Sequence, residues 1–296
     1  MPTLHALIAK LDFLPRWRVD DVMVSLSAAG GGVGPHVDQY DVFLLQAKGR
    51  RSWAYGGPAS PLVPGQPLRL LSGFEPQDQH DLESGDMLYL PPGVPHDGVA
   101  LDDNSVTLSI GFRAPGLSDL ASKLADQLLA RWHNDAEGEP RFTDAGRRQL
   151  VDNTSEIAPD DVRAMADLLA ACSQDLDQMT ALAGELVSEP RMPPHPPAAA
   201  PDGTSIRRRL CEGDVLERWA GSRLAHGALS DGQSVLFADG LSIPCPGELA
   251  RILSSSTSID LAAISGPFDA DAVDGVLAQL VEQGTFGFAD QDRDAD

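Results

Sequence analysis

Short apolar runs, each closed by turn residues, restrict the fold of this chain more than any other feature of its sequence. Between about Arg18 and Pro115 such runs alternate with Gly, Pro and Asp, and no segment with helical spacing lies between them. Closely spaced strands without crossover helices favour a sandwich or barrel over a parallel sheet. We therefore expect a β-barrel over residues 1–116, with strands that include 22–27, 42–45, 51–55, 87–90 and 106–110.

The residues that follow, 117–188, have the spacing of helices. Ser118 is a candidate N-cap before leucines that recur every four residues. From Asp160 to Leu186 the apolar side chains keep a three- and four-residue spacing, which predicts one long helix with a single apolar stripe. This stripe packs either on the chain's own barrel or on a second copy. Because it is longer than a small barrel can cover, we favour a homodimer through this helical region.

Two further zones complete the chain. Residues 189–204 contain six prolines, which predicts an extended linker. In the zone 205–296, Asp269 is expected to cap a helix that Gly284 ends before a short strand, the layout of a winged-helix domain. Such domains commonly bind nucleic acid. This one has seven Arg and no Lys against fifteen Asp and Glu residues, so we expect protein contacts instead.

The whole chain is strongly acidic. Its 22 Lys and Arg residues against 44 Asp and Glu residues give a net charge of −22. Direct nucleic-acid binding is not expected, because that affinity comes largely from basic side chains, and a basic protein partner fits better. No apolar run is long enough to cross a membrane, the N-terminus lacks a secretory signal pattern, and the three cysteines are scattered. We therefore expect a cytoplasmic protein without disulfides.

The segment His36-Val37-Asp38 predicts part of a metal site. Alternate residues of a strand project from the same face, so an imidazole and a carboxylate point together into the barrel. His96 is the candidate third ligand, because prolines on both sides of Gly93 stiffen the turn that presents it. Two imidazoles and one carboxylate form the facial triad of non-haem Fe(II) oxygenases, which leaves three metal positions open. The other histidines, His80 in a polar loop among them, are expected to be solvated.

A cosubstrate would occupy the open positions. If 2-oxoglutarate takes two of them and O₂ the third, its far carboxylate needs a fixed cation inside the barrel. Arg51, Trp53 and Tyr55 alternate onto one face of a strand, and a guanidinium fork suits a carboxylate. The alternative is that Arg51 lies on the surface, like its neighbour Arg50. Candidate hydrogen-bonding residues for the cosubstrate are Ser27 and Ser109.

Three segments carry a resemblance to a known family: GGGVGPHVDQYDVFLLQAKGRRSW (30–53), SGDMLYLPPGVPH (84–96) and SIGFRAP (109–115). Together they resemble the bacterial ribosomal oxygenases, which are JmjC-type 2-oxoglutarate oxygenases of the cupin superfamily. The resemblance implies a double-stranded β-helix, Fe(II) held by His36, Asp38 and His96, and 2-oxoglutarate held by Arg51. It also implies a helical dimerisation region and a C-terminal winged-helix-like domain.

The same resemblance implies a reaction, namely hydroxylation of C3 of an arginine in a large-subunit ribosomal protein. Gln39, Tyr40 and Asp41 follow the ligand pair and are expected to line the substrate mouth, with Asp41 as a candidate partner for a guanidinium. Family members carry a further N-terminal segment, which this chain is expected to lack. Two alternatives stay open: a cupin-type oxygenase acting on another protein or a small molecule, and a non-catalytic truncated protein that binds partners through its C-terminal zones.

Overall fold

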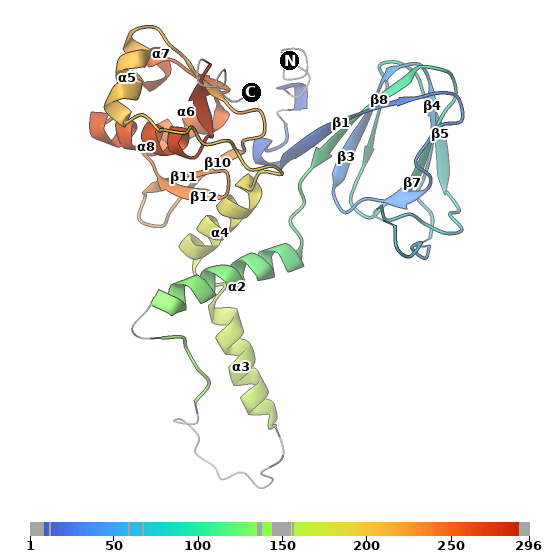
Figure 1. The fold of residues 1–296 in the computed structure, drawn as a ribbon. Coiled ribbons are helices and arrows are strands. Elements are labelled where there is room, and N and C mark those ends of the chain that lie inside the picture. The colour runs from blue at the N-terminus through green and yellow to red at the C-terminus, as the bar shows by residue number, and fades with distance from the viewer. Residues whose placement is uncertain are drawn as a thin grey trace. The chain divides into compact units, whose positions relative to one another are not determined.

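The computed structural model describes residues 9–11, 13–58, 60–66, 68–134, 138–143, 155 and 157–289. The chain divides into two compact units, residues 1–115 and residues 116–296. Figure 1 shows the strands of the first unit and the helices and small sheets of the second. None of the described helices is long and apolar enough to cross a membrane.

The first unit is a β-barrel of two four-stranded antiparallel sheets. The strand orders are β1-β8-β3-β6 in one sheet and β2-β7-β4-β5 in the other. Strands consecutive in sequence alternate between the sheets, except that β4 and β5 are paired neighbours in one sheet; this is the arrangement of the expected double-stranded β-helix. Two 3-10 turns, η1 (Ala9–Leu11) and η2 (Arg16–Arg18), come first. The strands are β1 (Val19–Ser27), β2 (His36–Val37), β3 (Asp41–Lys48), β4 (Arg51–Tyr55), β5 (Asp78–Leu82), β6 (Met87–Leu90), β7 (Pro95–Ala100) and β8 (Ser105–Phe112).

Strand alternation separates the inside of this barrel from its outside. Val42 and Leu44 of β3 pack with Trp53 in the interior cluster. Phe43, which lies between them in the sequence, packs on the opposite face with Phe112. The β3–β4 connection is a tight turn at Gly49, whose φ of +69° is one that other residues rarely adopt. The turn brings β4 back across the barrel, so its inward side chains face the interior cluster.

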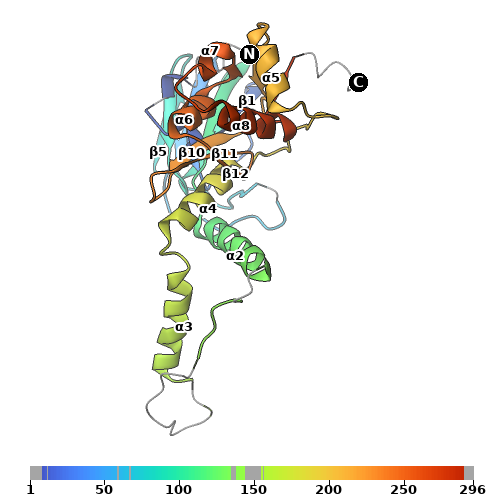
Figure 2. The same cartoon turned by 90° about the vertical axis from the view of Figure 1, so that its left-hand side faces the viewer.

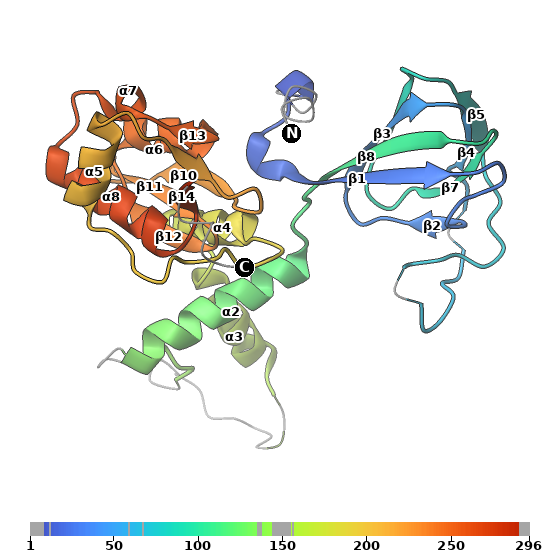
Figure 3. The same cartoon turned by 45° about the horizontal axis from the view of Figure 1, so that its top comes forward.

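The second unit holds helices around two three-stranded sheets, of order β10-β11-β12 and β13-β9-β14 (Figure 3). Its core is formed by apolar side chains of α5, α6, α8 and both sheets. The helices are α2 (Leu117–Asn134), α3 (Pro159–Ala171), α4 (Leu176–Ser188), α5 (Gly203–Cys211), α6 (Gly247–Ser255), α7 (Leu261–Ile264) and α8 (Ala270–Glu282). The strands are β9 (Leu216–Arg218), β10 (Leu224–Ala228), β11 (Ser234–Ala238), β12 (Leu241–Pro244), β13 (Ser258–Ile259) and β14 (Phe286–Phe288).

The end of this unit has the helix and strand that the sequence predicts. The Asp269 carboxylate accepts a hydrogen bond from the backbone N–H of Ala272 at 2.9 Å and so caps α8. Gly284 follows the helix with a φ of +79°, and the chain continues directly into β14. The last residues of the zone 205–296, from 290 onward, lie outside the described residues.

The prediction of one long helix from Asp160 is wrong. Two helices occupy that stretch, and four residues separate the end of α3 at Ala171 from the start of α4 at Leu176 (Figure 2). The cause lies at Asp175, whose carboxylate accepts hydrogen bonds from two backbone N–H groups, those of Asp177 and Gln178. A short acidic side chain that caps a new helix competes with continuation of the preceding one. The apolar stripe is therefore divided: α4 packs on β10 and β11, whereas α3 buries no residue.

Candidate metal centre

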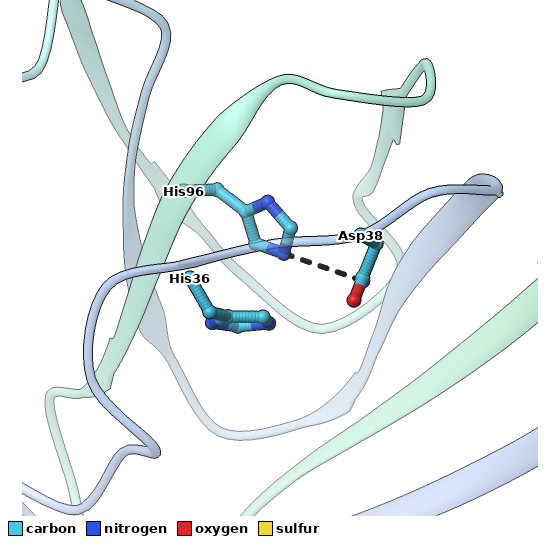
Figure 4. Close-up of side chains that lie close together, drawn as sticks. All are labelled: His36, Asp38 and His96. Atoms are coloured by element: carbon cyan, nitrogen blue, oxygen red, sulfur yellow. Dashed lines mark ion pairs between the residues drawn. The ribbon is translucent and has the colours of Figure 1, made fainter. Parts of the chain in front are cut away.

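Three predicted ligands lie together inside the barrel. β2 pairs with β7 so that His36 lies directly opposite His96, and Asp38 follows β2 by one residue. One nitrogen of each imidazole and one oxygen of the carboxylate all lie within 4.8 Å of one another. Asp38 Oδ2 is 3.7 Å from His96 Nε2, and the two imidazole centroids are 4.2 Å apart (Figure 4). The pairing of β2 with β7 thus brings together two histidines that are 60 residues apart in the sequence.

Backbone carbonyls fix both imidazoles in the form that a metal needs. Nδ1 of His36 lies 2.9 Å from the carbonyl oxygen of Gly34, and Nδ1 of His96 lies 2.9 Å from that of Val94. A carbonyl oxygen only accepts, so each Nδ1 carries a proton, and in the neutral imidazole Nε2 is then the nitrogen with the free lone pair. Burial, and next the charge of His36, lower the pKa of His96. The neutral imidazole, which is the ligand form, is therefore favoured at His96.

A buried arginine lies on the neighbouring strand. Arg51 is only 6% exposed, whereas the side chain of Arg50 is half exposed. The Nη2 of Arg51 donates to Ser27 Oγ at 2.6 Å, and the Nε of Arg51 has no hydrogen-bond partner. Desolvation lowers the pKa of the guanidinium, while the charge of Asp97 raises it. Among the residues that the structure describes, no carboxylate lies within ion-pair distance of Arg51.

The remaining predicted site residues separate into two groups. Ser27 contacts Arg51. Ser105 is paired with Ser27, and Ser109 lies four residues further along β8, so its side chain is on the same inner face. Tyr40 packs against the interior cluster. Gln39 is exposed.

Asp41 faces the other way. It lies opposite Phe112 on the outer face of its sheet, where its carboxylate forms an ion pair with Arg18 and accepts a hydrogen bond from Tyr89 at 2.6 Å. The structure therefore does not bring Asp41 to the three ligands.

Asp21 is a carboxylate on the inner face that the sequence reasoning missed. It lies over Gly111, where an added Cβ would come 2.9 Å from Asp21 Oδ1 and 3.5 Å from the ring of Tyr40. Gly111 thus leaves room for an acidic and an aromatic side chain next to each other. The inward alternation of residues 21, 23, 25 and 27 along β1 is the signal that could have identified it.

The expectation of a loop at His80 is wrong, whereas its expected exposure to solvent is confirmed. His80 lies in β5, opposite Trp53, and its Nδ1 is 2.9 Å from the hydroxyl of Tyr55. The two rings stack at 5.8 Å with an angle of 18° between them. The strand is polar throughout until Leu82, so no apolar alternation marks it in the sequence.

Comparison with known proteins agrees with this geometry. The JmjC domain family matches residues 6–120, and the ROXA-like winged-helix family matches residues 171–286. Ribosomal protein uL16 3-hydroxylase of Escherichia coli (strain K12) is 34% identical to this chain, over 96% of the chain and 74% of that protein. The chain belongs to the ribosomal oxygenases. The family resemblance seen in the sequence is therefore confirmed.

Other members support the same assignment. A probable ribosomal oxygenase of Haemophilus influenzae is 36% identical over 57% of this chain and 42% of that protein. The solved structure of the E. coli ribosomal oxygenase YcfD in complex with cobalt and 2-oxoglutarate superimposes with a TM-score of 0.77. It is 31% identical and covers 96% of this chain and 74% of that one. A complex of YcfD with cobalt and succinic acid matches with a TM-score of 0.76 at 32% identity.

Proposed function

We propose that this ribosomal oxygenase is an Fe(II)- and 2-oxoglutarate-dependent hydroxylase of a ribosomal protein. The observation that carries the proposal is the convergence of His36, Asp38 and His96 inside the same barrel as a buried guanidinium without a carboxylate partner. Two imidazole nitrogens and one carboxylate oxygen are a donor set that suits Fe(II). The relatives named uL16 3-hydroxylase and YcfD with cobalt and 2-oxoglutarate support the same activity.

In this proposal the three ligands hold the metal, and the carbonyls of Gly34 and Val94 hold the imidazoles in place. Fe(II), 2-oxoglutarate and O₂ together supply the oxidation of an unactivated C–H bond to an alcohol, with succinate and CO₂ as the other products. His36, Asp38 and His96 would supply three ligands to the metal, and the cosubstrate and O₂ would take the remaining positions. The chain's own contribution is to orient these groups and to keep water out.

Arg51 would bind the far carboxylate of 2-oxoglutarate. Its unpartnered Nε is a donor aimed into a dry interior, where a charge-assisted hydrogen bond is strong. Ser27 holds the other end of the guanidinium and so fixes its rotation. Ser109, on the same inner face, remains a proposed hydrogen-bonding residue for the cosubstrate.

The substrate side chain would enter beside Tyr40 and Asp21. An arginine guanidinium stacks on an aromatic ring and pairs with a carboxylate, and both groups lie next to each other over Gly111. Because Asp41 is held on the outer face, we assign the guanidinium partner to Asp21, with Gln39 at the exposed rim. The net charge of −22 steers a basic ribosomal protein toward the enzyme. The target we propose is C3 of an arginine in a large-subunit ribosomal protein.

We also propose a cytoplasmic homodimer that forms through residues 117–188. The exposed apolar side chains of α3 support it, since Val162, Met165 and Leu169 are 53%, 42% and 76% exposed. Figure 2 shows α3 apart from the helices of the core of its unit. A helix that buries none of its own residues has its apolar face available to a second copy. The barrel (1–116), linker (189–204) and winged-helix zone (205–296) complete the proposed domain order.

Mass spectrometry of ribosomal proteins tests the proposal. Ribosomes from cells that lack the gene are incubated with the purified protein, Fe(II), 2-oxoglutarate and air, and an arginine of a large-subunit protein should gain one oxygen atom. The His96→Ala variant is the matched control. Succinate formation without a modified ribosomal protein would point to a different substrate. Absence of any succinate would instead leave the non-catalytic alternative.

A further inference from the structure

Among the residues of the barrel that the structure describes, two buried side-chain N–H groups have no hydrogen-bond partner. They are Nε of Arg51 and Nε1 of the Trp53 indole, and these side chains belong to residues that are 6% and 4% exposed. Buried donors are almost always paired in native proteins, so each unpaired one calls for an explanation. A third unpartnered polar atom, Asp97 Oδ1, is an acceptor and belongs to the residue after His96, on the other face of β7.

The two donors are neighbours on one face of β4. Arg51 and Trp53 are alternate residues of the strand, and the guanidinium carbon lies 5.7 Å from the centre of the indole. On its other side, the indole centroid is 5.9 Å from that of His96. Trp53 therefore lies between the proposed carboxylate-binding arginine and the proposed metal ligands.

The indole packs tightly against the opposite strand, and its N–H has no acceptor among the described residues. Trp53 lies opposite Gly98 of β7, and a Cβ added to that glycine would come 2.6 Å from the six-membered ring. The ring thus occupies the space that the missing side chain leaves. The indole also packs in the cluster with the buried side chains of Val42, Leu44, Leu82 and Leu90, which carry no acceptor. Nε1–H is a fixed donor in a dry interior.

We propose that the Trp53 indole N–H is a second donor to the far carboxylate of 2-oxoglutarate, beside Arg51. This inference rests on the proposed function, which puts that carboxylate at Arg51. A carboxylate accepts about four hydrogen bonds, so one guanidinium does not saturate it. An indole donates and cannot accept, which makes it specific for an acceptor such as a carboxylate oxygen. Two donors of fixed direction select a dicarboxylate over a monocarboxylate 2-oxo acid.

The direct test is NMR of the indole N–H groups in the Zn(II)-loaded protein. The chain has four tryptophans, and the Trp53 signal is identified by its loss in Trp53→Phe or, should that variant not fold, by elimination with the other three. Adding 2-oxoglutarate should move the Trp53 signal downfield. Pyruvate has the same 2-oxo acid group without the far carboxylate and should leave it in place. A Trp53 signal that stays put while 2-oxoglutarate shifts other signals would overturn the inference.

A binding titration separates this inference from the proposed function. Calorimetry with Zn(II) and 2-oxoglutarate should show at least about tenfold weaker binding for Trp53→Phe, the usual effect of losing a hydrogen bond to a charged group. Trp17→Phe, at a position 39% exposed, is the matched control and should bind normally. Unchanged binding in Trp53→Phe with weak binding in Arg51→Lys would overturn the role of Trp53 alone. Unchanged binding in both would overturn the cosubstrate site itself.

Discussion

Replacing Arg51 with methionine should stabilise the protein without cosubstrate and destabilise it with cosubstrate. Arg51 is 6% exposed, one nitrogen donates to Ser27 at 2.6 Å, and Nε has no partner. An unsatisfied buried donor costs about 1–3 kcal/mol and burial of a charge without a counter-ion costs several kcal/mol more, whereas a hydrogen bond to a charged group contributes about 1.5–3 kcal/mol. Methionine has a similar length and no donors. Arg51→Met should therefore raise the free energy of unfolding by about 1 kcal/mol when no 2-oxoglutarate is present.

The sign should reverse when the cosubstrate binds. At a concentration one hundred times its Kd, a ligand stabilises the native state by about 2.7 kcal/mol. Arg51→Met loses the guanidinium that binds the far carboxylate, so 2-oxoglutarate should stabilise this variant very little. A change of 1 kcal/mol moves the Tm of a protein of this size by roughly 2–4 °C. The variant should thus melt a few degrees above the wild type alone, and a few degrees below it with 2-oxoglutarate.

Thermal unfolding of the Zn(II)-loaded protein, with and without 2-oxoglutarate, measures both effects. Arg50→Met is the matched control, because its side chain is 50% exposed and should change neither melting curve. Equal ligand-induced shifts in Arg51→Met and the wild type would refute the reasoning. So would a variant that melts lower without ligand, since Arg51 would then be a structural residue.

Three further predictions follow from the proposed roles. His96→Ala should abolish 2-oxoglutarate turnover while the fold persists, as followed by succinate release and circular dichroism; near-normal turnover would remove His96 from the ligand set. Leu169→Glu should give monomers in light scattering, because a charge on the exposed face of α3 cannot be buried in a dimer interface; a wild type that is already monomeric at micromolar concentration would contradict the dimer. Asp21→Asn should raise the apparent KM for a substrate peptide at least about tenfold, and Asp41→Asn should not; the reverse order would return the guanidinium to Asp41.

The sequence predicts those parts of the barrel in which apolar runs or side-chain alternation carry the signal. β3 holds an apolar run that ends before the turn at Gly49, and alternation places Arg51, Trp53 and Tyr55 of β4 on one face. The ligand pair His36 and Asp38 could be recognised because residues two apart in a strand project from the same face, so no tertiary contact is needed to bring them together. Its pairing with β7 then brought His96 opposite His36.

Other features were not readable because they depend on tertiary contacts. β5 is polar along most of its length and is a strand only because β4 offers it a partner, so His80 was expected in a loop. Apolar spacing continues through the break before Leu176, and only the cap at Asp175 ends the pattern. Asp41 follows the ligand pair in the sequence, whereas Asp21 lies 15 residues before His36. Which of them faces inward depends on the register of β3 and β1 with β8.

The measurement that tests the proposed chemistry most directly is the ratio of two products in one reaction. Purified protein, Fe(II), 2-oxoglutarate, O₂ and the unmodified ribosomal protein are incubated, and succinate and hydroxylated arginine are both quantified, with His96→Ala as the blank. Coupled hydroxylation predicts about one succinate for each hydroxylated arginine, and neither product in the blank. Hydroxylation without succinate, or product formation that survives in His96→Ala, would contradict a 2-oxoglutarate-dependent centre built on His36, Asp38 and His96.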